Sequence, residues 1–187
     1  MANPFDLAAS LKSIYETVEF DAIRRDVDAK GIDKVIADAA LMAGSAGAVG
    51  GFGGGATAVL GIPAVLAVTV AMQFRVTVAV IYHKTGAIKV DFDRFIKIVA
   101  VSLGVDVGVG IAAGLVTAVA GQILVRLGAR SVGIVIPLFG ALVGGATSYA
   151  FITTVASTLM AMDMSDATRT ADDPDPGTDL APEQEAA

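Results

Sequence analysis

Two charged residues interrupt long uncharged stretches, and they are the strongest candidates for chemistry in this chain. No ionisable residue separates Asp38 from Arg75, and Asp106 is the only charge between Lys97 and Arg126. Arg75 and Asp106 each lie about 15 residues from the middle of the charged segment between them. At a rise of about 1.5 Å per residue, two antiparallel helices would hold both side chains at a similar depth. We therefore expect them to form an intramembrane ion pair.

Two roles for this pair remain open. An isolated charge near the centre of a bilayer costs about 2.5 to 3.5 kcal/mol on insertion scales, so such residues usually face a partner or water. The pair is either a static bridge that fixes the register of two helices, or a polar switch on a conduction path. Five polar residues could add hydrogen bonds, but they do not define a continuous polar track: Thr69, Gln73, Thr77, Ser102 and Thr117.

No other residues form a recognisable reaction centre. His83, the only histidine, follows Tyr82 and precedes Lys84 at a predicted helix end, where such residues commonly lie at the level of lipid headgroups. A general base would need a nucleophile or an orienting carboxylate nearby, although a pH sensor is conceivable. The chain has no cysteine, and no serine, histidine and acid set suggests a triad. We expect no catalytic, cofactor-binding or metal-ligating residues and no enzymatic activity.

A glycine-rich stretch imitates two nucleotide-binding motifs. Gly51, Gly53 and Ala56 have the spacing of the dinucleotide fingerprint, but no strand pattern precedes them and no acidic residue follows about 20 positions later. The segment 50–57 has the spacing of a phosphate loop, but Ala56 occupies the lysine position. Residues 1–162 carry a net charge of only +1, which offers no broad basic face for nucleic acid. Neither nucleotides nor nucleic acids are expected partners.

The composition indicates a membrane protein. The 187 residues are 55% hydrophobic with a mean hydropathy of +0.71, and a second uncharged tract runs from Arg130 to Asp163. A helix needs about 20 mostly apolar residues to cross a bilayer. We predict an all-α, membrane-embedded bundle of about four hydrophobic segments, at about 39–56, 62–83, 96–125 and 132–162. The first segment is short and rich in glycine, so it is alternatively re-entrant or only embedded.

Two further regions flank this hydrophobic membrane domain, which spans residues 39–162. Residues 1–38 form an amphipathic N-terminal helical region that begins near Pro4 and is divided at Gly31. It either lies on lipid headgroups or packs on the rest of the protein, and its excess of acid over base favours packing. Residues 163–187 carry a net charge of −7 and are predicted to be a disordered acidic tail. The tail is either a docking peptide or a solubilising extension.

Glycines spaced four residues apart predict close helix packing. This spacing places small residues on one helical face, where helix backbones in lipid can approach each other. The pattern, a glycine zipper, predicts assembly with copies of the chain or with a membrane protein partner. The candidate helix-packing residues are Gly47, Gly51, Gly104, Gly108, Gly110, Gly114, Gly140 and Gly144.

Basic residues orient the predicted segments. The first 30 residues contain no apolar signal-peptide core, so we expect the N-terminus to stay in the cytoplasm. Four crossings would then place the basic loop at 84–97 and the C-terminal tail in the cytoplasm as well, leaving only Arg126 and Arg130 outside. This arrangement satisfies the positive-inside bias. It predicts a protein of the bacterial inner membrane, with membrane lipid as a partner and both termini cytoplasmic.

The hydrophobic domain also resembles a known family. The residues that carry the resemblance are Gly50 to Gly55, Gly61-Ile62-Pro63, Arg75, Tyr82, and Ile136-Pro137-Leu138-Phe139-Gly140 leading through Gly144 to Tyr149. Over roughly residues 40–160 they resemble the EcsC-like proteins, and the later block is similar to the hydrophobic helical hairpin appended to some bacterial GTPases. The resemblance implies a bacterial membrane-associated helical protein without an established enzymatic reaction.

Two functions follow from these expectations. The first is a non-catalytic membrane scaffold or accessory protein of EcsC-like type, which assembles through glycine-rich helix faces. The alternative is a pore-forming or permeation protein whose helices assemble around Arg75 and Asp106. The sequence favours the scaffold.

Overall fold

The chain folds into an all-helical structure. The computed structural model describes residues 4–49, 64–105, 112–128 and 137–164, and these residues contain seven helices and no strand. The helices are α1 (Pro4–Glu16), α2 (Phe20–Lys30), α3 (Ile32–Val49), α4 (Ala64–Thr85), α5 (Phe92–Ser102), α6 (Ala112–Gly128) and α7 (Pro137–Ala161). The all-α prediction is therefore confirmed.

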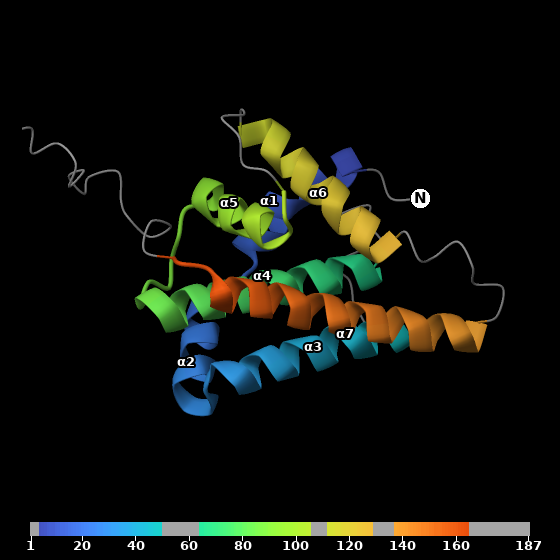
Figure 1. Cartoon of the computed structure of the whole chain (residues 1–187), viewed down its shortest axis with the longest axis horizontal. Coiled ribbons are helices and arrows are strands. Elements are labelled where there is room, and N and C mark those ends of the chain that lie inside the picture. The colour runs from blue at the N-terminus through green and yellow to red at the C-terminus, as the bar shows by residue number, and fades with distance from the viewer. Residues whose placement is uncertain (1–3, 50–63, 106–111, 129–136, 165–187) are drawn as a thin grey trace, which may run out of the picture.

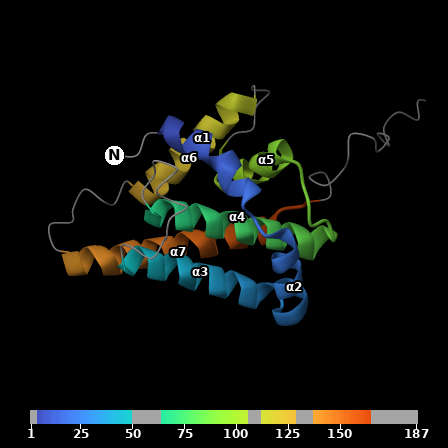
Figure 2. The same cartoon turned by 180° about the vertical axis from the view of Figure 1, so that it is seen from behind.

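The helices form two layers that share α4. Figure 1 shows the long helices α3, α4 and α7 side by side along the length of the molecule, with α1, α5 and α6 on the opposite side of α4. The view from behind places α2 at the end of the molecule where α4 finishes (Figure 2). The second layer is held together by contacts of α6 with α1 and α5.

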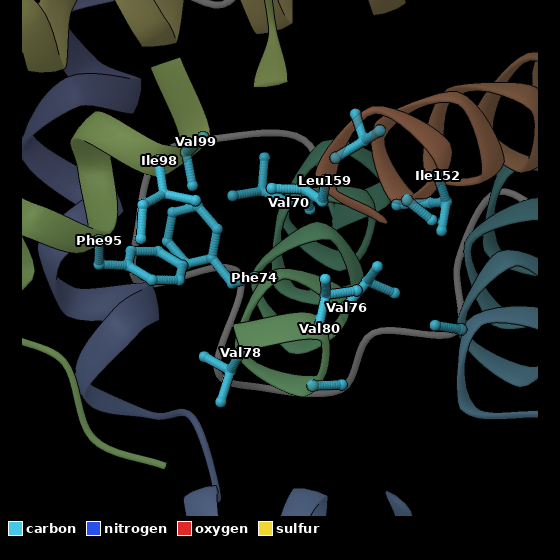
Figure 3. Packing of buried hydrophobic residues seen from close by; sticks show 14 of the residues in the cluster. Val70, Phe74, Val76, Val78, Val80, Phe95, Ile98, Val99, Ile152 and Leu159 are labelled. Atoms are coloured by element: carbon cyan, nitrogen blue, oxygen red, sulfur yellow. The ribbon is translucent and has the colours of Figure 1, made fainter. Parts of the chain in front are cut away.

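Helix α4 is the core of the protein. Apolar residues occur on all its faces, so it has no side that is suited to water. Phe74 points toward Phe95 of α5, while Val76 and Val80 point toward the layer of α3 and α7 (Figure 3). These four residues are fully buried. Both layers therefore bury their apolar faces against this helix.

Tyr15 packs α1 against this core through ring contacts and a hydrogen bond. Its ring lies 4.5 Å from the ring of Phe95 and 6.4 Å from that of Phe74, measured between centroids. Its hydroxyl donates a hydrogen bond to the carbonyl of Val90, in the loop before α5. Burial raises the pKa of the Tyr15 hydroxyl above its usual value, with the nearby Asp91 charge as a second cause. The N-terminal helix is therefore packed on the protein, as one of the two interpretations of this region expected.

Two predicted segments overlap a single long helix each, whereas a third is interrupted. Helices α4 and α7 correspond to the segments expected at 62–83 and 132–162, and α7 begins at Pro137. The segment expected at 96–125 is not continuous, because α5 ends at Ser102 and Gly104 follows with a φ of +66°. Only glycine adopts that conformation readily. Hydropathy did not reveal this break, because the residues on both sides of Gly104 are mostly apolar.

The boundary expected between the N-terminal region and the hydrophobic domain falls inside a helix. Gly31 separates α2 from α3, as predicted, and has a φ of +78°. Helix α3 then runs past residue 38 without a break. The division of residues 4–30 into α1 and α2, at 17–19, was not predicted.

Helices α3 and α7 approach each other closely at a glycine. A Cβ atom added to Gly44 would lie 3.2 Å from the carbonyl oxygen of Gly145 and 3.5 Å from Cβ of Tyr149. The contact depends on the missing side chain, since real Cβ atoms rarely come so near. Gly44 was not among the candidate packing residues, because the positions four residues away on either side, 40 and 48, are alanine rather than glycine.

One helix meets the length and composition of a membrane span. Among the described residues it is Leu66–Thr85, and 67% of its most apolar stretch is buried inside the protein. The core helix of a water-soluble protein meets the same criterion. Embedding of the whole bundle in a membrane therefore stays a prediction.

We expect Gly44→Val to destabilise the protein by about 1 to 3 kcal/mol, because the added methyl groups overpack the contact between α3 and α7. The matched control is Gly121→Val in α6, where an added Cβ atom meets nothing within 4 Å. It should change the free energy of unfolding by less than about 0.5 kcal/mol. Thermal and denaturant unfolding followed by circular dichroism would measure both. Equal losses in the two variants would contradict a close contact at Gly44.

Candidate functional site

Arg75 lies at the junction of α2, α3 and α4, in a cluster of charged side chains. Its Nη2 atom donates a hydrogen bond to Oδ2 of Asp26. The other carboxylate oxygen of Asp26 lies 2.8 Å from Nζ of Lys30. Two cations therefore share one carboxylate, and this triad carries a net positive charge.

The sequence of α2 explains how Asp26 reaches Arg75. Ile23 and Val27 are buried four residues apart and fix the face that α2 turns toward the core. Asp26 is next to Val27, so it lies at the edge of that face, beside α4. Lys30 follows four residues later on the same side of α2. The amphipathic spacing was visible in the sequence, but nothing in it indicated which helix the face would contact.

The neighbouring cations keep Asp26 ionised. The hydrogen bond from Lys30 is the largest cause that lowers the pKa of the Asp26 carboxyl, and the charges of Lys30 and Arg75 lower it further. Partial burial opposes these effects. The carboxylate is therefore charged at neutral pH and completes the triad.

A hollow of about 260 Å³ lies beside the triad. Its polar side consists of Asp26, Lys30 and Arg75, together with Asp38, whose carboxylate lies 2.7 Å from Nζ of Lys34. The apolar side is lined by Val35, Ala39, Met42 and Met72. We call it the Arg75 hollow. It combines fixed charges with flexible apolar side chains.

The predicted pair of Arg75 with Asp106 stays a prediction, because Asp106 lies outside the described residues. Arg75 already has a carboxylate partner in Asp26, which sequence reasoning did not propose. The guanidinium is 27% exposed, at an edge of the bundle where α2 covers α4. The ion pair between Arg75 and Asp26 therefore connects α4 to α2 of the N-terminal region.

The predicted interfacial residues lie at the C-terminal end of α4. The hydroxyl of Tyr82 donates a 3.0 Å hydrogen bond to Oδ1 of Asp28 in α2. Nζ of Lys84 donates to the carbonyl of Met160, at 2.8 Å, and to that of Met162. These carbonyls end α7, where a cation is favourable. His83 is exposed.

The predicted packing glycines do not all lie on closely packed helix faces. Gly104 forms the turn after α5 rather than part of a helix face, and an added Cβ atom at Gly114 would meet nothing within 4 Å. Gly47 lies in α3, and Gly140 and Gly144 lie in α7. Gly51, Gly108 and Gly110 fall outside the described residues. Packing of these glycines between copies of the chain stays a prediction.

Three buried polar residues follow one side of α4. Thr69, Gln73 and Thr77 are spaced four residues apart, and all three are fully buried. Thr69 lies 3.4 Å from the hydroxyl of Ser148 in α7, and the Thr77 hydroxyl donates to the carbonyl of Gln73. The side-chain amide of Gln73 has no hydrogen-bond partner within the described part of the chain. An unsatisfied buried amide is costly.

The exposed side of α7 carries no charge. All 25 residues of this helix are uncharged at neutral pH, and its exposed residues in the described part are Ala146, Tyr149, Ala150, Thr154, Ser157, Met160 and Ala161. Two hydroxyls bond back to the helix: Ser157 donates to the carbonyl of Thr153 at 2.9 Å, and Thr158 to that of Thr154 at 3.0 Å. Hydroxyl groups that donate to the helix backbone have fewer hydrogen bonds to offer to solvent. We call this surface the α7 face.

Comparison of the chain with protein-family models, curated proteins and solved structures finds no match. The resemblance to EcsC-like proteins therefore stays a prediction. Within residues 4–49, 64–105, 112–128 and 137–164, no three carboxylate or imidazole groups gather where they could hold a metal ion. The Arg75 hollow and the α7 face remain as the candidate functional surfaces.

Acidification should weaken the contact between α2 and α4. The folded pKa of Asp26 lies below its ordinary value of 3.8, so its ionised form stabilises the fold at neutral pH. That contribution is lost as the pH falls through 3.8 toward the lower folded-state pKa. The difference in unfolding free energy between the native chain and Asp26→Asn should therefore shrink over this window. Urea unfolding at stepwise lower pH would measure it, and a constant difference would exclude Asp26 as the titrating group.

We expect Gln73→Leu to stabilise the protein by about 1 to 3 kcal/mol, since leucine fills a similar volume without the unsatisfied amide. The matched control is Gln122→Leu in α6, where the side chain is only half-buried and a small change is expected. Denaturant unfolding would compare the two variants. A loss of stability in Gln73→Leu would show that the amide has a bound partner, such as an internal water.

Proposed function

We propose that this protein is a non-catalytic membrane-associated scaffold or accessory protein of bacterial, EcsC-like type. The observation that carries the proposal is the uncharged α7 face. A long exposed helix of a water-soluble protein normally presents charged residues to solvent. The α7 face presents alanine, threonine, serine, tyrosine and methionine instead. Lipid or an apolar partner helix would suit that surface.

The neighbouring helix supports the same orientation. In the second half of α3, Leu41 is 59% exposed and Met42 is 55% exposed, and no charged residue follows Asp38 in this helix. Exposed apolar residues that gather on adjacent helices commonly mark an interaction surface. Since α3 and α7 are in contact, these uncharged exposed residues lie on neighbouring helices.

Charge is concentrated at the opposite end of α3. Helix α2 exposes Asp21, Arg24, Arg25, Asp28 and Lys30. This end of the molecule also holds the C-terminus of α4, with His83 and Lys84 (Figure 2). This separation of charged from uncharged residues supports a charged end in the cytoplasm and an uncharged surface that faces lipid. Close packing at Gly44 supports assembly of the helices through small residues.

A permeation protein is the second candidate, and the buried stripe on α4 favours it. Thr69, Gln73 and Thr77 would line a polar path if the helices around α4 separated. Flux from liposomes that contain the native chain, Gln73→Leu or Asp106→Asn would test this function. Selective flux that either substitution abolishes would favour a pore, whereas no flux from the native chain favours the scaffold.

We expect Thr154→Glu to lower the membrane-bound fraction of the protein about tenfold or more. Thr154 is exposed on the α7 face, and a carboxylate there would have to leave water. A cost of about 1.4 kcal/mol is a factor of ten, and a charge in hydrocarbon costs more than that. Membrane fractions extracted with carbonate and with detergent would measure the effect.

Two controls separate charge from other changes. Thr154→Gln has the size of glutamate without its charge and should reduce binding far less. Ser13→Glu adds the same charge at an exposed position of α1 and should leave membrane binding unchanged. Equal binding by Thr154→Glu and the native chain, with folding intact by circular dichroism, would exclude the α7 face as the lipid-facing surface.

A further inference from the structure

The Arg75 hollow has the charge pattern of an anion site. Two cations, Arg75 and Lys30, face one carboxylate, Asp26, and the fourth charge, Asp38, has its own cation in Lys34. One positive charge beside the hollow is therefore not neutralised. A singly charged anion would balance the cluster.

Arg75 retains donors for such an anion. Only its Nη2 atom has a hydrogen-bond partner among the described residues. A guanidinium has five N–H donors in a planar fork, which suits the oxygens of phosphate. The side chain is 27% exposed and lines the hollow, so the remaining donors are within reach of a ligand.

The apolar part of the lining suits an alkyl chain. Met42 and Met72 line it together with Val35 and Ala39. Methionine is flexible and polarisable, so it adapts to apolar ligands of different shape. Met42 is 55% exposed, and Leu41 beside it is 59% exposed. Met42 thus belongs both to the lining of the hollow and to the exposed surface of α3.

The volume and the position of the Arg75 hollow restrict the class of ligand further. The volume of about 260 Å³ is below the roughly 300 Å³ at which pockets for drug-sized molecules begin, so it fits a headgroup and the first methylenes of a chain. The hollow is lined by residues of α2, α3 and α4, between the charged residues of α2 and the exposed apolar residues Leu41 and Met42 of α3. In a membrane-associated protein, lipid phosphates lie at such a boundary.

We propose that the Arg75 hollow binds the phosphate group of an anionic membrane lipid, with Arg75 and Lys30 holding the phosphate and Met42 and Leu41 contacting the acyl chain. The proposal rests on the membrane association proposed above. It adds a specific lipid site to that association. Lipid binding would also strengthen the contact between α2 and α4, because the phosphate would bridge their cations.

Binding of a short-chain lipid tests the site without a membrane. Dihexanoyl phosphatidic acid, below its critical micelle concentration, would be titrated into the full chain in a non-ionic detergent and followed by calorimetry. We expect saturable binding that is at least tenfold tighter than that of inorganic phosphate or dihexanoyl phosphatidylcholine. Equal affinity for inorganic phosphate would overturn the lipid assignment, and no binding would overturn the site.

Substitutions locate the binding. Arg75→Gln should weaken binding of dihexanoyl phosphatidic acid at least tenfold. Met42→Glu tests the same site at an exposed position where folding is not at risk, and the same loss is expected. The matched control is Arg94→Gln, an arginine of α5 that is paired with Asp91 away from the hollow. Unchanged affinity in both hollow variants, or an equal loss in Arg94→Gln, would overturn the proposal.

Vesicle flotation separates the two proposals. Vesicles of phosphatidylcholine alone and vesicles that contain phosphatidic acid would be compared for the native chain and Arg75→Gln. Absence of flotation on both vesicles would contradict membrane association, while binding of the short-chain lipid would still support the site. Flotation that depends neither on phosphatidic acid nor on Arg75 would support association and overturn the lipid site.

Discussion

Helix α4 sets the constraint on which the rest of the structure depends: a helix with apolar residues on all its faces must be covered along most of its surface. Helices α3 and α7 cover one side, and α1, α5 and α6 cover the other. The small residue at Gly44 lets α3 and α7 come together beneath α4. The aromatic rings of Tyr15 and Phe95 fill the opposite side around Phe74. Two layers are the result.

Polar groups on α4 need partners within that arrangement. Arg75 has one because α2 brings Asp26 to the edge of the bundle, and Tyr82 has one in Asp28 of the same helix. Helix α2 thus supplies hydrogen-bond partners to polar residues in the second half of α4, while its own outer surface is charged. Gln73 lies deeper and has no partner among the described residues. The core therefore retains a buried amide that apolar packing alone would not select.

Much of the architecture was predictable from the sequence, because charge and hydropathy report where helices can be buried. They predicted an all-helical chain, long apolar segments where α4 and α7 lie, and the break at Gly31. They did not predict the turn at Gly104, since a positive φ leaves no trace in hydropathy. The partner of Arg75 was also missed. Asp26 and Arg75 are far apart in sequence, and only tertiary packing brings α2 to α4.

Lys84 joins the last turns of two core helices. Its ammonium lies on the carbonyls of Met160 and Met162, at the end of α7, while its backbone belongs to the end of α4. The strongly acidic stretch of the chain begins directly after these carbonyls, at Asp163. A molecule that bound this acidic stretch would therefore act on α4 as well as on α7. A force on α7 would also reach α4 through the hydrogen bonds of Lys84 and through the packing of the two helices.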